Sequence, residues 1–359
     1  MGIWSQIKIL GHKDTVKDIA DGRGNLRAPV HVQIEPTEAC NFRCTFCHWH
    51  NPELKEGFTS FDFTGKRSLD TDCMLKLVDE LAELGVRAIS FTGAGDPLMH
   101  GGLWKVLERI RARKIDYAVT SNFAMPLREE LIEGLSHASW LRWSMNAGGF
   151  ETFASIHNPR ADAYKDFMRQ RENIKRLAAE RRGTGQKSLS ASFVITGGNE
   201  DDIIPAANLA KELGCGSLSY RPDTPFKKTI VSAGYSSKVI DNLKKAEGLS
   251  SEDFEVYPNY ERLDAMIFSE DKKLVCYYMN HSTYIAANGD LYPCCYTRCD
   301  KRYVMGNIKD GGFKAAWFSE KRVNFYKSVY YNSCPPCHHG STNKVLKHLY
   351  GDTEQDNFV

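Results

Sequence analysis

Residues 35–50 read EPTEACNFRCTFCHWH, and this stretch carries three cysteines in a C-x3-C-x2-C arrangement: Cys40, Cys44 and Cys47. The stretch follows residues 30–34, VHVQI, whose β-branched, apolar character predicts a strand. Three thiolates on one short loop can converge on one iron–sulfur cube and leave one iron open to a substrate or cofactor. A zinc ion would need a fourth ligand, which His48 or His50 could supply.

The last quarter of the chain contains four further cysteines that form a hairpin pair and a C-x2-C pair: Cys276 and Cys294, then Cys334 and Cys337. The segment ANGDLYPCC between the first two predicts a β-hairpin with an Asn-Gly turn. Four thiolates in this order suit a zinc ribbon or a 4Fe-4S cluster. Cys295 is adjacent to Cys294 and could ligate in its place.

Length and composition narrow the class of protein. The chain has 359 residues, 11 cysteines and a net charge of +2. The N-terminus has no apolar stretch long enough for a signal peptide, and nowhere do about 18 apolar residues run together. We therefore expect a cytoplasmic protein without a membrane partner, in which cysteines favour metal or redox chemistry over disulfides. A near-neutral charge gives no basic field for nucleic acid.

Strand and helix signals alternate through the first two-thirds of the chain, which indicates parallel strands with helices outside them. Strands are predicted at 30–34, 88–91, 117–120, 141–145, 190–195 and 217–220. Helices are predicted at 72–84, 103–111, 127–133, 164–180 and 204–213. Thr71 or Asp72 is expected to cap the first of these helices, and Gly85 to end it. Six strands suit an open partial barrel or a doubly wound sheet, with the chemistry at the carboxyl ends of the strands.

We expect three segments along the chain. Residues 1–225 should form the strand–helix domain and residues 226–270 a connector of helices and loops. From residue 271 to residue 359, short β-like runs, glycine turns and cysteines predict a small domain built around the second thiolate site.

The first cysteine loop resembles that of the radical S-adenosylmethionine (SAM) enzymes, whose C-x3-C-x-aromatic-C motif follows the first strand of a partial barrel. Phe46 stands at the aromatic position. The resemblance implies an α/β fold with a partial (β/α)6 TIM-like barrel, and a 4Fe-4S cluster whose open iron is chelated by SAM. It further implies that SAM is cleaved to a 5′-deoxyadenosyl radical, which abstracts a hydrogen atom from the substrate.

The same resemblance implies where SAM binds. A Gly-rich segment after the second strand, TGAGDP, should meet the SAM amino group through Gly93, Gly95 and Asp96, with Asp in place of the commoner Glu. His48 directly follows the third cysteine. Other polar residues near the ends of the third, fourth and sixth strands are candidates: Ser121, Asn122, Ser144, Asn146 and Arg221. For the first four of these, turn capping is the alternative role.

The C-terminal cysteines resemble the auxiliary-cluster domains of radical SAM enzymes, whose hallmark is a C-x9–15-G-x4-C hairpin. Here Gly289 and Cys294 satisfy the G-x4-C spacing. The longer form, SPASM, holds two clusters and needs a C-x2-C-x5-C-x3-C run, whereas the sequence shows no cysteine after Cys337. We therefore expect the truncated form, twitch, with one fully ligated cluster. The cofactors implied are SAM and two 4Fe-4S clusters.

The resembling enzymes suggest the substrate class. Those with one auxiliary cluster act on aminocyclitols, aminoglycosides and related hydroxylated molecules, in part in antibiotic biosynthesis. Few residues precede Cys40, which favours a small substrate over a peptide bound through an N-terminal leader-binding domain. A maturase of ribosomal peptides is the first alternative, and a non-catalytic iron–sulfur or zinc scaffold is the second. A flavodoxin or ferredoxin is the expected electron donor.

The outcome of the reaction depends on the fate of the substrate radical. A dehydrogenase needs an electron acceptor, for which the auxiliary cluster is suited, together with a base. An epimerase needs a hydrogen-atom donor on the opposite face, and Cys215 and Cys299 are spare thiols for that role. Polar side chains near the strand ends could bind hydroxyl or amino groups: His48, His50, Asp96, His100, His157 and Asp223.

Overall fold

The computed structural model describes residues 7–24, 26–51, 61–185, 189–223, 236–260, 276–328, 334, 337 and 339–351. In this part of the chain, one ten-stranded sheet has the order β10-β9-β8-β1-β2-β3-β4-β5-β6-β7. The strands are β1 (His31–Ile34), β2 (Ala88–Phe91), β3 (Asp116–Ser121), β4 (Trp140–Ser144), β5 (Leu189–Ile195), β6 (Ser217–Pro222), β7 (Glu255–Tyr257), β8 (Ser282–Ile285), β9 (Asp290–Tyr292) and β10 (Gly306–Asn307).

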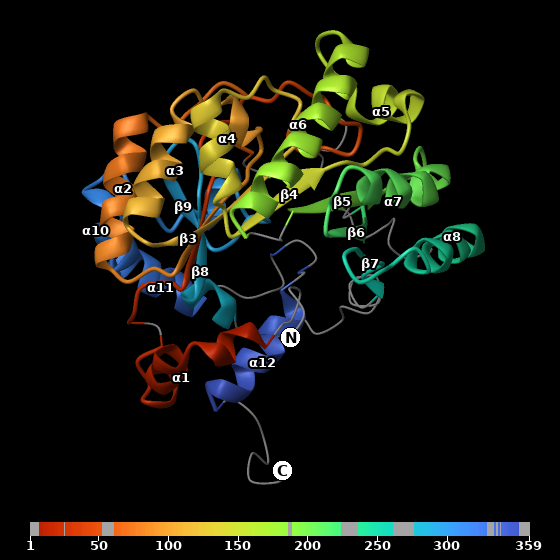
Figure 1. The fold of residues 1–359 in the computed structure, drawn as a ribbon. Helices are drawn as coiled ribbons and strands as arrows, with labels where there is room; N and C mark the ends of the chain where they lie inside the picture. The colour runs from red at the N-terminus through yellow and green to blue at the C-terminus, as the bar shows by residue number, and fades with distance from the viewer. Residues whose placement is uncertain are drawn as a thin grey trace.

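Each neighbouring pair from β1 to β7 is parallel, and β8 also pairs in parallel with β1. The helices are α1 (Lys13–Ala20), α2 (Thr71–Glu83), α3 (Leu103–Ala112), α4 (Glu129–Ser136), α5 (Phe150–His157), α6 (Ala163–Gly183), α7 (Ile203–Glu212), α8 (Ser237–Glu247), α10 (Gly312–Trp317), α11 (Glu320–Ser328) and α12 (Gly340–Leu349). Figure 1 shows α2, α3, α4, α6 and α7 in an arc outside the strands. The expected α/β partial barrel is confirmed.

The barrel helices follow the predicted pattern, with one correction at a cap. Asp70, and not Thr71 or Asp72, caps α2, because its carboxylate accepts hydrogen bonds from the backbone N–H groups of Asp72 and Cys73. Such a cap stabilises a helix by about 1 kcal/mol. The helix is followed by Gly85, whose φ of 77° is in the left-handed region, as predicted.

The expected connector at 226–270 is in part an extension of the barrel. Its residues 236–260 contain α8 and β7, and β7 pairs in parallel with β6. The remainder of the connector lies outside the described residues. Sequence reasoning missed β7 because a three-residue strand carries almost no periodic signal.

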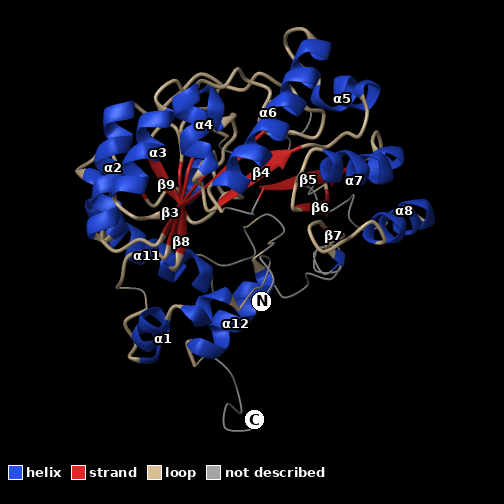
Figure 2. Ribbon diagram, in the orientation of Figure 1, coloured by secondary structure: helices blue, strands red, loops and turns tan. Residues whose placement is uncertain are grey.

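The predicted C-terminal hairpin is present as β8 and β9, which pair antiparallel across the Asn288-Gly289 turn. Because β8 also pairs with β1, this hairpin continues the barrel sheet. Figure 2 shows β8 and β9 among the red strands near β3. The division at residue 271 therefore remains a prediction, since one sheet runs across it. No described helix is long and apolar enough to cross a membrane.

Candidate active site

The three thiols of the first motif lie close together in the loop after β1. The pKa of Cys40 is raised to about 12, chiefly by burial and also by the nearby Asp96 carboxylate and Cys47 thiol. Burial also raises the pKa of Cys44, and the neighbouring thiols of Cys47 and Cys40 raise it in the same direction. Three thiols whose ionised forms would repel one another suit a cationic iron centre, which binds them as thiolates in exchange for their protons.

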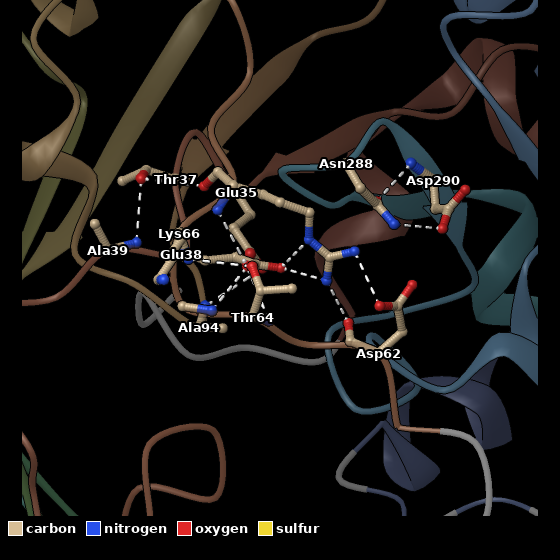
Figure 3. A network of polar contacts seen from close by, with 12 residues as sticks. Glu35, Thr37, Glu38, Ala39, Asp62, Thr64, Lys66, Ala94, Asn288 and Asp290 are labelled. Carbon is tan, nitrogen blue, oxygen red and sulfur yellow. Dashed lines mark hydrogen bonds and ion pairs between the residues drawn. The ribbon is translucent and has the colours of Figure 1, made fainter.

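A buried ion pair fixes the backbone that leads into this loop. Glu38, which is 2% exposed, accepts hydrogen bonds from the Thr64 hydroxyl at 2.7 Å and from the Gly65 N–H at 2.9 Å. Arg67 donates its Nε–H to the same carboxylate at 2.7 Å and Nη1–H to Asp62 at 3.0 Å. Burial opposes ionisation, but these donors hold the pKa of Glu38 below its ordinary value. Figure 3 shows Thr64 and Asp62 within this network.

His157 lies behind the loop and contacts Cys44, with Nδ1 3.2 Å from the thiol sulfur. Its Nε2 is 2.8 Å from the carbonyl oxygen of Met145. Because a carbonyl oxygen can only accept a hydrogen bond, Nε2 carries the proton. Burial lowers the pKa of His157 to about 4, so that the ring is neutral near pH 7. The ring packs between Phe42 and Phe153. His157 therefore positions Cys44 and does not face a substrate.

Asp96 is occupied by bonds within the protein. Its two carboxylate oxygens accept from the Ser121 hydroxyl, at 2.8 and 2.9 Å, and from the backbone N–H groups of Leu98 and Asn122. Asn122 in turn donates to the side-chain oxygen of Asn41, beside Cys40. Asp96, Ser121 and Asn122 thus join the loops after β2 and β3 to the cysteine loop. These bonds within the protein correspond to turn capping, the alternative role given above for Ser121 and Asn122. Direct contact with SAM stays a prediction.

Gly93 and Gly95 are required by the protein's own packing. A Cβ on Gly95 would lie 2.4 Å from the carbonyl oxygens of Thr37 and Ala39, and one on Gly93 would lie 2.8 Å from Cγ of Glu35. Only glycine permits the loop after β2 to approach the backbone before Cys40 this closely. This packing requires glycine at both positions, and the expected contact of this segment with the SAM amino group stays a prediction.

The remaining SAM candidates differ in their surroundings. Asn146 is 3% exposed, and its side-chain oxygen accepts from the N–H of Val194, which ties the ends of β4 and β5 together. Phe46 and His48 are half-buried within the cysteine loop. Ser144 and Arg221 are half-buried at the carboxyl ends of β4 and β6.

The two hydrogen-donor candidates occupy different places. Cys215 precedes β6, at the amino end of the strand, and lies in the main apolar core, where burial raises its pKa to about 12. This position argues against a role at the opposite, carboxyl edge. Cys299 is 3% exposed and packs with Trp49 and Ala94, next to Cys47, so it lies beside the site.

The four C-terminal thiols also come together. The pKa of Cys334 is raised to about 12, chiefly by burial and also by the thiols of Cys294 and Cys276. Burial likewise raises the pKa of Cys337, and the same two thiols contribute. Cys295 packs with Cys334 against the apolar cluster around Tyr284, so Cys294 as the fourth member stays a prediction. Four thiols are the donor set of one fully ligated 4Fe-4S cluster.

One group at this site had no sequence signal. Arg298 is 7% exposed and donates hydrogen bonds to the Tyr284 hydroxyl at 2.9 Å and to the Gly93 carbonyl at 3.2 Å. The Tyr284 hydroxyl donates in turn to Glu35, which is fully buried at the end of β1. The guanidinium lies 4.1 Å from the centroid of the Trp49 ring. The residues come from separate strands and loops, so no local pattern could reveal them.

Comparison with known proteins decides the family. The pattern that defines the radical SAM superfamily matches residues 34–210, and that of the SPASM iron–sulfur cluster-binding domain matches residues 276–339. The chain belongs to the radical SAM superfamily. It is a radical SAM enzyme with a C-terminal SPASM-type domain, and its cofactors are SAM, a 4Fe-4S cluster and an auxiliary cluster.

Curated relatives include GTP 3′,8-cyclases. The Aquifex aeolicus protein is 27% identical over 328 residues, which cover 82% of this chain and 91% of the relative. The Chlorobaculum tepidum protein is 39% identical over 184 residues, which cover 50% of this chain and 49% of the relative.

Solved structures share the fold at low sequence identity. Streptococcus suis SuiB, bound to its precursor peptide SuiA, has a TM-score of 0.62 at 15% identity, covering 91% of this chain and 76% of SuiB. The protein anSMEcpe with bound AdoMet has a TM-score of 0.56 at 19% identity, covering 83% of each chain.

Proposed function

We propose that this radical SAM enzyme removes a hydrogen atom from a C–H bond of a small hydroxylated substrate, of the sugar, aminocyclitol or nucleoside-like class. In this proposal the first cluster is held by Cys40, Cys44 and Cys47. The auxiliary cluster, of the twitch form, is held by Cys276, Cys294, Cys334 and Cys337.

The inner face of the strands carries the substrate proposal. Tyr220 on β6 donates its hydroxyl to the Ile203 carbonyl of α7, so even-numbered residues of β6 face the helices. Odd-numbered residues of β6 therefore face inward, together with their register partners on β4 and β5. This inner face is rich in hydroxyl groups and guanidinium groups: Arg142, Ser144, Ser190, Ser192, Ser217, Ser219 and Arg221.

A wall of hydroxyl groups suits a substrate with many hydroxyl groups. Ser192 is 1% exposed, and its hydroxyl has no hydrogen-bond partner among the described residues. A buried polar atom without a partner costs about 1–3 kcal/mol, which a hydroxylated ligand could recover and an apolar one could not. Arg142 and Arg221 supply positive charge on the same face, which suits a phosphate or carboxylate substituent. The similarity to GTP 3′,8-cyclases supports the nucleoside-like arm of the class.

The chain's own residues organise the reaction. When bound, SAM and the first cluster supply a 5′-deoxyadenosyl radical that takes a hydrogen atom, and the auxiliary cluster supplies an acceptor for the electron that the substrate radical loses with its proton. Glu38, with its partner Arg67, fixes the entry to the cysteine loop. Asp96 joins three loops of the site, and His157 orients Cys44. Dehydrogenation is the outcome proposed, and Cys299, beside the site, is the residue to test for epimerisation.

The experiment is a substrate screen with the anaerobically reconstituted, dithionite-reduced protein. We expect iron at about eight per chain. We also expect 5′-deoxyadenosine formation to rise with one member of a panel of nucleotides, aminocyclitols and amino sugars. Deuterium from that substrate should appear in the 5′-deoxyadenosine. Stimulation by peptides alone would favour peptide maturation, and zinc without SAM cleavage would favour a scaffold. Reduction by a flavodoxin or ferredoxin in place of dithionite tests the proposed donor, and a cytoplasmic location remains part of the proposal.

A further inference from the structure

Arg298 lies between the two thiol groups. It follows Cys294 by four residues, and its guanidinium is stacked on Trp49, which follows Cys47 by two. Its hydrogen bond to the Gly93 carbonyl reaches the loop after β2. One side chain therefore contacts the first cysteine loop and the Gly-rich loop while it is covalently part of the auxiliary segment.

The positive charge of Arg298 lies close to a residue that contacts a thiol of each site. Its neighbour Cys299 packs with Trp49 in an apolar cluster that Cys47 also joins. The hydroxyl of Thr297, its neighbour on the other side, lies 3.9 Å from the Cys294 sulfur. The Glu35 carboxyl group is separated from the guanidinium by the Tyr284 hydroxyl.

The environment makes this charge effective. Arg298 is 7% exposed, so little water screens it, and guanidinium groups do not deprotonate in proteins. Its Nε–H is buried and has no hydrogen-bond partner among the described residues, which leaves one donor uncommitted. The reduction potential of an iron–sulfur cluster depends on nearby charge, hydrogen bonds and exposure. A fixed cation favours the reduced state, which carries one more negative charge.

We propose that Arg298 is a positioning residue shared by the two iron–sulfur sites: its buried cation raises the reduction potential of both clusters, and its contacts join the loops that hold them. This inference rests on Cys47 and Cys294 as ligands and does not depend on which substrate is used. In this proposal, the charge of one side chain shifts the reduction potentials of both clusters in the same direction.

The test is a redox titration of both clusters, followed by electron paramagnetic resonance, in Arg298→Gln, Arg298→Met and Arg298→Lys. The neutral variants should disfavour reduction of both clusters by about tenfold, which is about 59 mV for a one-electron couple. Lysine retains the charge, so Arg298→Lys should recover most of the shift.

Arg322→Gln is the matched control. Arg322 is also buried and lies 3.8 Å above the ring of Trp317, with a hydrogen bond to Asn280. None of the main influences on its pKa is a cysteine. Its variant should leave both potentials unchanged.

Each outcome decides the proposal. Unchanged potentials in the neutral variants would overturn it, as would an equal shift in Arg298→Lys or Arg322→Gln, because geometry or general destabilisation would then be the cause. If the neutral variants lose iron and Arg298→Lys keeps it, the charge is needed for the sites themselves, which supports the proposal. Loss of iron in Arg298→Lys as well would show that the contacts of Arg298 act without its charge, which would overturn the claim that its cation sets the potentials.

Discussion

The two thiol sites are assembled in different ways. The first takes its three cysteines from one loop directly after β1. The auxiliary site takes its four from a position before β8, another after β9, and a C-x2-C pair before α12. The first site is therefore local in sequence, while the second requires distant segments to meet before it exists.

The contacts around the two sites differ as well. The first loop is fixed by buried polar bonds, from Glu38 to Arg67 and from Asp96 to Asn122. At the auxiliary site, the Tyr278 ring is stacked on His339 at 3.8 Å, and the Tyr278 N–H donates to Asn343 of α12. Because its cysteines come from distant segments, we expect the auxiliary site to depend more on its metal for order than the first site does.

Removal of the metal should produce the largest difference between the two sites. Chelation under reducing conditions should increase hydrogen exchange in α12 and around Tyr278 far more than in β1 to β4. The reason is that four buried thiols lose their common partner, and binding energy at such a site is folding energy. Hydrogen-exchange mass spectrometry is the measurement. Equal increases at both sites would contradict the asymmetry.

The next effect concerns which of two adjacent cysteines belongs to the auxiliary site. Cys294→Ala should remove about four irons per chain. Cys295→Ala should leave the iron content unchanged, because Cys294 is the thiol that acts on Cys334 and Cys337. Iron and sulfide analysis distinguishes the two variants, and the reversed pattern would show that the assignment is wrong.

Gly95→Ala should damage the first site through packing alone. Its methyl group would lie 2.4 Å from two backbone carbonyl oxygens, so the cysteine loop would have to move. We expect a loss of about 3 kcal/mol in the free energy of unfolding, at the upper end for overpacking. The first cluster should also be lost. Gly101→Ala is the matched control, since nothing lies within 4 Å of its added methyl. An unchanged melting temperature for Gly95→Ala would refute the account.

A smaller effect is expected for Arg67→Met, which leaves the buried Glu38 carboxylate without its charged partner. The cost should be about 2 kcal/mol at pH 7. Arg176→Met, on an exposed pair with Glu129, should leave stability almost unchanged. Both are measured by urea unfolding of the cluster-free protein.

The same pair predicts a pH dependence. Because its donors hold the pKa of Glu38 below the ordinary 4.5, ionised Glu38 stabilises the fold above that pH. This contribution is lost as the pH falls through the lower, folded-state value. The difference between wild type and Arg67→Met should therefore shrink below about pH 4.5. A constant difference down to pH 3 would mean that the pair acts only through packing.

The barrel strands and the two cysteine motifs could be recognised from the sequence because each depends on residues that are close together in the chain. Each predicted barrel strand lies within two residues of an observed one, since apolar runs and glycine turns mark them. The strand β7 was missed because it has three residues. The predicted N-cap of α2 was wrong by one or two residues, because several polar residues lie at the start of that helix and cap propensity alone does not choose among them.

The supporting residues of the site could not be predicted from sequence. Glu38 and Arg67 are far apart in the chain, as are Arg298 and Gly93, and only the fold brings them together. For Asp96, the sequence predicted a carboxylate that meets SAM, whereas its partners within the protein come from the ends of other loops and had no local signal. Such contacts depend on tertiary geometry, which periodicity and spacing do not encode.

The central claim is that one loop holds the SAM-binding cluster and that the C-terminal cysteines hold a separate auxiliary cluster. Mössbauer and iron analysis of the Cys40→Ala, Cys44→Ala, Cys47→Ala triple variant tests this most directly. The account predicts about four irons per chain in one intact 4Fe-4S cluster, with SAM cleavage abolished. Loss of all the iron, or SAM cleavage that persists in the triple variant, would contradict it.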